Sequence, residues 1–98
     1  MQLIYHPLAE REVIEAARYY EQRVTSLGAQ FLAAVDLAAS AITGAPERWR
    51  IIELDVRQYL MPRFPYAVYY RIVPGQVRIL AVKHHRRHPD YWRSRLEN

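Results

Sequence analysis

The densest group of side chains that could do chemistry is the run His84–His88, which reads His-His-Arg-Arg-His. A metal site could use His84 with His88, or His85 with His88, completed by a carboxylate such as Asp90. The two arginines inside the run would repel a bound cation. We therefore expect no metal and no cofactor here.

The same run could instead act on a phosphate. A histidine can serve as general acid or base, and an arginine can stabilise the charge of a phosphorane. As a binding surface, the run would be a cationic tip at the end of a strand, and it could also be a solvated basic corner. These alternatives stay open at this point. If the chain is a ribonuclease, its catalytic residues are His84, His85, Arg87 and Tyr91.

Two pairs of adjacent aromatic residues add to this picture. Tyr91-Trp92 follows the basic run and could stack on the bases of single-stranded RNA. Aromatic residues near a C-terminus more often fold back onto a sheet, so we expect Trp92 to pack and leave the role of Tyr91 open. In the pair Tyr19-Tyr20, the second tyrosine fits a core stripe and the first is half exposed or under a partner.

Other site classes lack the residues they need. The chain has no cysteine, hence no disulfide and no thiolate metal site, and three glycines make no phosphate-binding loop. No membrane span or signal peptide is expected. A length of 98 residues fits one domain, residues 1–98. The sequence thus predicts a single-domain cytoplasmic protein.

Charge is divided unevenly along the chain. Residues 1–49 hold four arginines and six acidic side chains, a net charge of −2. Residues 50–98 hold nine arginines, Lys83 and four acidic side chains, a net charge of +6. A basic half favours an acidic partner, either a protein or a nucleic acid.

The first half of the chain predicts a strand followed by two helices. Residues 3–6 alternate as a short strand, and Pro7 suits the first position of a helix over 7–23. Thr25-Ser26 offers an N-cap for a second helix, which Gly44 and Pro46 end. Its apolar residues extend so far round the cylinder that either the fold or a partner must cover them.

The second half predicts strands over 56–61, 66–73 and 77–84, with a turn at 73–76 and a short helical turn over 90–96. Both faces of the middle strand are partly apolar, so the helices cannot be the only cover of the sheet. The order is strand, two helices, three strands. The expected fold class is α+β, with a helix hairpin packed on an antiparallel sheet.

Several local strings, in this order and spacing, carry a family resemblance across essentially the whole chain. They are His6-Pro7 with Ala9-Glu10, Ala17–Glu21, Leu27-Gly28, Phe31-Leu32, Pro46–Arg48, Val56-Arg57, Arg63–Arg71, Ile79–Val82, His84, Arg86-Arg87, Pro89 and Trp92. The chain resembles the ParE-type plasmid-stabilisation toxins of the RelE/ParE superfamily. The resemblance implies a RelE-like fold and the toxin of a type II toxin–antitoxin system, neutralised by a cognate acidic antitoxin.

Two activities occur in that superfamily. RelE-type members cut messenger RNA on the ribosome with basic side chains, whereas ParE-type members poison DNA gyrase without cutting RNA. Where the RNA-cutting branch has two lysines and an arginine, this chain has Gln58, Leu60 and Ala67, while Arg87 fits a fourth cationic position. The resemblance therefore favours a binding-type toxin over an enzyme. The alternatives are a ribosome-dependent endoribonuclease using the histidine–arginine run, and an interaction domain with no target.

Two surfaces follow from this interpretation. We expect the antitoxin on the helix hairpin and an outward sheet face, and the target at a basic end of the sheet. Partners would be the antitoxin and gyrase, or else the ribosome and its mRNA, with no membrane and no DNA contact except through the antitoxin. The antitoxin-binding residues are Tyr19, Leu32, Leu37, Tyr69 and Arg71, and the target-binding residues are Arg57, Arg63, Arg86, Arg87 and Tyr91.

Overall fold

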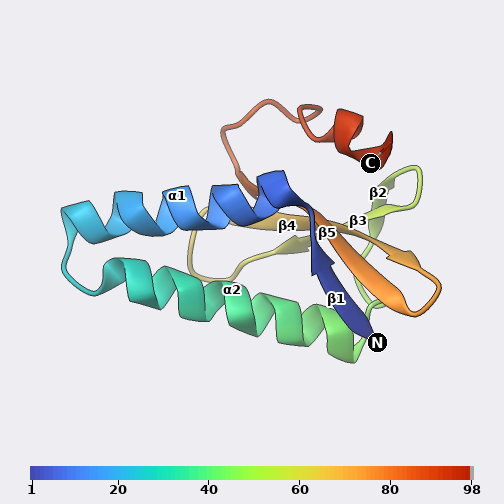
Figure 1. Ribbon diagram of the computed structural model, residues 1–98, viewed down its shortest axis with the longest axis horizontal. Helices are drawn as coiled ribbons and strands as arrows, with labels where there is room; N and C mark the ends of the chain where they lie inside the picture. The colour runs from blue at the N-terminus through green and yellow to red at the C-terminus, as the bar shows by residue number, and fades with distance from the viewer. Residues whose placement is uncertain (98) are drawn as a thin grey trace.

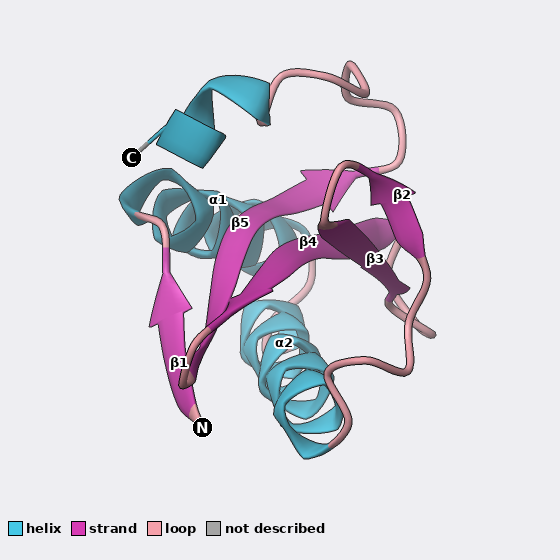
Figure 2. Ribbon diagram, turned by 90° about the vertical axis from the view of Figure 1, so that its right-hand side faces the viewer, coloured by secondary structure: helices cyan, strands magenta, loops and turns pink. Residues whose placement is uncertain are grey.

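A computed structural model describes residues 1–97 of the protein. A helix hairpin lies on one face of a five-stranded sheet (Figures 1 and 2). The C-terminal segment, residues 85–97, lies on the other face. The α+β fold expected from the sequence is confirmed. The elements are β1 (Gln2–Tyr5), α1 (Pro7–Arg23), α2 (Leu27–Gly44), β2 (Ile51–Glu53), β3 (Val56–Leu60), β4 (Tyr66–Val73), β5 (Gln76–His84) and a 3-10 helix, η1 (Arg93–Glu97).

The sheet differs from the expected one in two ways. Its strand order is β1-β5-β4-β3-β2, and β1 pairs parallel to β5, with Leu3 opposite Val77, so the sheet is mixed. The strand β2 was not expected, because three residues are too few to show an alternating pattern. Alternation also indicates which residues of β1 face the core, but it does not indicate which strand lies beside β1.

Both helices begin with a side-chain cap, although the second cap is not the one expected. In α1, the ring Nδ1 of His6 accepts the backbone N–H of Leu8 at 3.1 Å and Pro7 follows. The expected cap of α2 by Ser26 is wrong, since its side chain makes no capping bond. The carboxylate of Glu21 accepts the backbone N–H groups of Ser26 and Gly28 instead, both at 2.9 Å.

Gly28 is required for this close crossing of the two helices. A Cβ atom there would lie 2.5 Å from the carbonyl oxygen of Ala17. Because the Glu21 carboxylate also sits at the positive end of α2, it stabilises the helix as well as closing the hairpin.

The sheet separates two cores. Between the hairpin and the sheet, the rings of Tyr20, Phe31, Phe64 and Tyr66 pack with centroids 5.0–6.4 Å apart. On the opposite face, the C-terminal segment buries a second cluster beneath Trp92, whose exposed fraction is 1%. This confirms that the helices are not the only cover of the sheet and that Trp92 packs. The second cluster comprises Val56, Ala67, Tyr69, Leu80, Ala81 and Trp92.

A break in strand register builds part of that second core. Tyr69 pairs with Ala81 and Tyr70 pairs with Ile79, so Leu80 is an additional residue in β5. The bulge puts Leu80 and Ala81 on the same side, against the C-terminal segment, while Ile79 and Val82 face the helices.

The helix α2 is long and apolar enough to cross a membrane by length and composition alone, with 18 residues and a mean hydropathy of 1.4. The same properties are typical of the core helix of a soluble protein. Here α2 buries Phe31 and Ile42 against the sheet. Leu32 and Leu37 remain exposed on its outer side.

Candidate functional site

The cationic tip predicted from the sequence lies where β5 ends beside the loop between β3 and β4. The backbone N–H of His85 donates to the carbonyl of Pro65 at 2.9 Å, which joins the two segments. Arg63, Arg86 and Arg87 are therefore grouped at one end of the sheet. Arg63 also donates to the Gln30 side chain, and its guanidinium lies 5.2 Å from the Phe64 ring centre.

A pocket of about 240 Å³ lies at this tip, between α1 and the end of β5. Three of the four residues proposed for a ribonuclease, His84, Arg87 and Tyr91, line it, whereas His85 is exposed outside the lining. Tyr19 and Tyr66 complete its aromatic wall. The structure thus brings most of the predicted cluster together around one cavity.

His84 is held as a neutral ring at this site. Its Nδ1 accepts the backbone N–H of Arg86 at 3.0 Å, and its ring meets Tyr66 edge-on at 5.1 Å. Burial lowers the pKa of His84, and repulsion from the neighbouring His85, Arg86 and Lys83 lowers it further. The ring therefore gains a proton only below its usual range, so at neutral pH His84 adds no charge to the tip.

Tyr91 is held by Glu12 of α1, a residue that the sequence analysis did not assign to a site. The hydroxyl of Tyr91 donates to Glu12 Oε2 at 2.6 Å, and burial together with this bond raises the pKa of Tyr91. The guanidinium carbon of Arg87 lies over the Tyr91 ring, 4.1 Å from its centre. Tyr91 is therefore a fixed hydrogen-bond donor and a platform for a cation, and it does not titrate near neutral pH.

A signal for Glu12 was present in the sequence. Glu12 follows Ala9 by three residues and precedes Ala16 by four, and both alanines are buried. An acidic side chain at that spacing lies beside the core stripe of the helix. The glutamate is 10% exposed and faces the C-terminal segment.

Two residues predicted for partner surfaces lie elsewhere than expected. The outward position expected for Tyr69 is wrong: it is 5% exposed, with its ring 5.7 Å from that of Trp92, because the C-terminal segment covers this sheet face. Arg57 donates to the carbonyls of Glu47 and Trp49 at 2.9 and 2.7 Å, which fixes the loop after α2.

The remaining predicted residues are accessible. Arg71 lies at the other end of the sheet, where it pairs with Asp55 at 2.8 Å. Tyr19 is half exposed and packs against the Arg23 guanidinium at 4.2 Å. Leu32 and Leu37 project from α2.

Positions 58, 60 and 67, which would carry cations in an RNA-cutting relative, lie on the sheet face that the C-terminal segment partly covers. Gln58 donates to the hydroxyl of Tyr69 at 3.0 Å, Leu60 is exposed, and Ala67 is buried. Lys83 pairs with Ala67 across the strands, but it is 6% exposed and donates to the carbonyl of His84 at 3.2 Å. Among the described side chains, those of residues 1–96, no three metal-ligating groups lie together.

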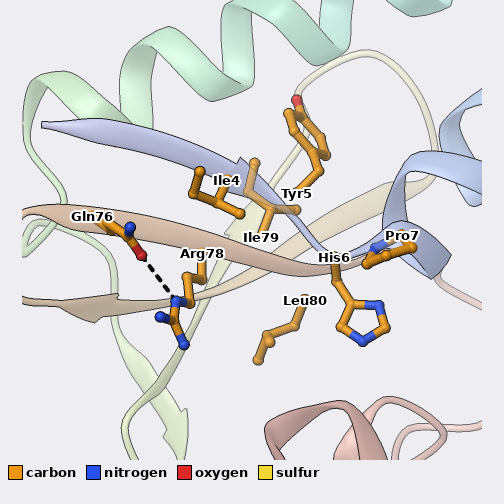
Figure 3. A pocket seen from close by; sticks show the side chains of 8 residues that line it. All are labelled: Ile4, Tyr5, His6, Pro7, Gln76, Arg78, Ile79 and Leu80. Atoms are coloured by element: carbon orange, nitrogen blue, oxygen red, sulfur yellow. Dashed lines mark hydrogen bonds between the residues drawn. The ribbon is translucent and has the colours of Figure 1, made fainter. Parts of the chain in front are cut away.

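A larger pocket of about 510 Å³ lies along the edge of the sheet between β1 and β5 (Figure 3). Tyr5 points towards α2, whereas Arg78, Leu80 and His6 lie on the opposite side of the strands. Arg78 donates to the Gln76 side chain at 3.1 Å, and His6 is used as the helix cap. None of the residues predicted for a site lines this pocket.

Comparison with known proteins fits this architecture. Residues 3–89 match the family described as the ParE toxin of type II toxin–antitoxin system, parDE. Among solved structures, the chromosomal ParDE TA system from P. aeruginosa matches with a TM-score of 0.66 at 18% identity, covering 86% of this chain and 95% of that chain. No curated protein sequence matches. The structural likeness supports the fold, and the family match extends over most of the chain: the protein belongs to the ParE toxin family of type II toxin–antitoxin systems.

Proposed function

We propose that this toxin acts by inhibiting DNA gyrase through a protein–protein contact and does not cut RNA. The observation that carries the proposal is the loss of positive charge at positions 58, 60 and 67, where Gln, Leu and Ala stand on one sheet face. Cleavage of an RNA phosphodiester needs a base, an acid and cations around a crowded phosphorane. Without those cations the reaction should lose several orders of magnitude in rate.

The pocket at the tip supplies little positive charge in place of those cations. The lowered pKa of His84 disfavours its charged form, and the hydroxyl of Tyr91 donates to Glu12. The side chains that remain available are those of Arg86 and Arg87, which are exposed. Exposed arginines next to each other suit a contact with acidic side chains of a partner.

The test of this proposal is a pair of assays on the same purified protein. In a supercoiling assay with gyrase and relaxed plasmid, we expect inhibition that rises with toxin concentration. With translating ribosomes and primer extension, we expect no toxin-dependent cuts. Codon-specific cleavage that disappears in the variant Arg87→Gln would establish the ribonuclease alternative instead.

For the antitoxin, we propose the outer side of α2 as the main contact. Leu37 is 71% exposed and borders a groove of about 530 Å³ between α2 and β3, whose lining includes Ala33, Ala34 and Tyr59. Contiguous apolar surface on a small soluble protein usually marks a protein contact. With Tyr69 covered by the C-terminal segment, the proposed antitoxin surface is restricted to the hairpin side.

The variant Leu37→Glu should weaken antitoxin binding by roughly thirtyfold, the loss that corresponds to about 2 kcal/mol at a buried interface position. Calorimetry with the purified antitoxin measures it. The matched control is Leu54→Glu, at an equally exposed leucine in the turn between β2 and β3, which should bind as the native protein does. Equal binding by both variants would remove α2 from the interface.

A further inference from the structure

The carboxylate of Glu12 has all of its hydrogen-bonding capacity in use. Its Oε1 accepts from the backbone N–H of Val82 and from Arg95 Nη1, both at 3.0 Å. Its Oε2 accepts from the Tyr91 hydroxyl at 2.6 Å and from Arg95 Nη2 at 3.0 Å. A carboxylate offers about four lone-pair sites, so these four donors fill it.

Arg87 is a cation close to Glu12 that takes no part in these four hydrogen bonds. Its Nη1 lies 3.9 Å from Glu12 Oε2, close enough for attraction but too far for a hydrogen bond. The side chain is 55% exposed and rests on the Tyr91 ring. Among the described side chains, those of residues 1–96, its guanidinium forms no hydrogen bond, so its donors are available to a partner.

The surroundings of Arg87 favour an anionic partner group. The negative charge of Glu12 is matched by the buried guanidinium of Arg95, and Arg86 adds a further exposed cation nearby. Burial raises the pKa values of Tyr66 and Tyr91, so both hydroxyls stay protonated. Glu15, the other acid in the pocket lining, is exposed.

We propose that Glu12 is a positioning residue of the toxin: it holds Tyr91 and Arg87 in place so that the Arg87 guanidinium receives an acidic side chain of the target at the pocket between α1 and β5. The inference rests on the proposed function in its choice of target. The planar guanidinium of an arginine can donate two parallel hydrogen bonds to one carboxylate. A guanidinium already resting on a fixed ring loses less freedom on forming them.

The first experiment does not involve gyrase. The ¹⁵N-labelled, full-length protein is titrated with a hexaglutamate peptide at low salt while the side-chain Nε–H signal of Arg87 is followed. We expect this signal to shift in the native protein, and the variant Glu12→Gln to bind the peptide roughly tenfold more weakly, as for loss of one charge-assisted pair. The control Glu10→Gln removes the same charge from an exposed position on the same helix and should bind as the native protein does.

A double-mutant cycle separates positioning from general destabilisation. If Glu12 acts through Arg87, then Arg87→Gln and Glu12→Gln each weaken gyrase binding about tenfold, and the double variant is little weaker than either. Losses that multiply, or native-like binding by Glu12→Gln, would overturn the inference. Should Glu12→Gln not fold, Glu12→Asp keeps the charge and should give intermediate peptide binding.

The two experiments also tell the proposals apart. If gyrase does not bind the native protein, the proposed target is wrong, and the peptide titration still decides the role of Glu12. If the Arg87 signal does not respond to the peptide in the native protein, the carboxylate site is wrong whatever the target is.

Discussion

The double substitution Arg86→Glu, Arg87→Glu is expected to abolish toxicity. Both arginines are exposed at the tip, and the proposed target contact needs positive charge there. Placing like charges opposite each other at a contact costs several kcal/mol, so gyrase inhibition should fall by at least roughly a hundredfold. The supercoiling assay measures this loss, and growth after induction in cells lacking the antitoxin measures its effect on toxicity.

The fold and antitoxin binding should survive this change, because both side chains are exposed and the proposed antitoxin surface lies on α2. The matched control is Arg48→Glu, Arg50→Glu, which reverses the same amount of charge at two exposed positions after α2. This control should remain toxic. If it loses toxicity equally, net charge and not the tip determines target binding, and the site is wrong.

The substitution Trp92→Ala is expected to have the largest effect on stability. The ring is 1% exposed and covers the second core, so its removal leaves a cavity beside Tyr69. Large-to-small changes of a buried aromatic typically cost about 3–5 kcal/mol. Urea denaturation followed by circular dichroism should show a lower midpoint, and we expect the C-terminal segment to lose its protection from hydrogen exchange first.

The companion variant Trp92→Phe should cost much less. Among the described side chains, those of residues 1–96, the buried indole Nε1 has no hydrogen-bond partner, so phenylalanine removes volume but no hydrogen bond. A loss as large as that of Trp92→Ala would mean that the indole N–H has a partner in solution, such as a buried water.

The secondary structure was predictable where local chemistry specifies it. Pro7 begins α1, Gly44 ends α2, and the β-branched and aromatic runs of β3 to β5 lie where expected. Long-range pairing was not predictable, because the alternation of β1 does not record that β5 is its neighbour. The cap of α2 was misassigned since Glu21, seven residues before Gly28 in the chain, reaches it only through the hairpin crossing.

The candidate site was predictable in its residue types but not in its geometry. The basic run His84–His88 and Tyr91 were recognisable from the order of residues in the sequence. The role of Glu12 depends on its contact with Tyr91, which lies 79 residues later in the chain. For the same reason, Tyr69 was expected on an open face: its cover, Trp92, comes from an irregular segment that has no periodic pattern.

The parallel pairing of β1 with β5 has a consequence for synthesis on the ribosome. The N-terminal strand emerges first, yet its partner is residues 76–79, and the second core waits further for Trp92. Helix α1 and helix α2 can form early, but contacts between distant segments are completed only when the intervening chain is available. A growing chain therefore lacks its sheet edge, its second core and its cationic tip until residues 76–92 have left the ribosome, so a shorter nascent chain cannot yet form the proposed target contact.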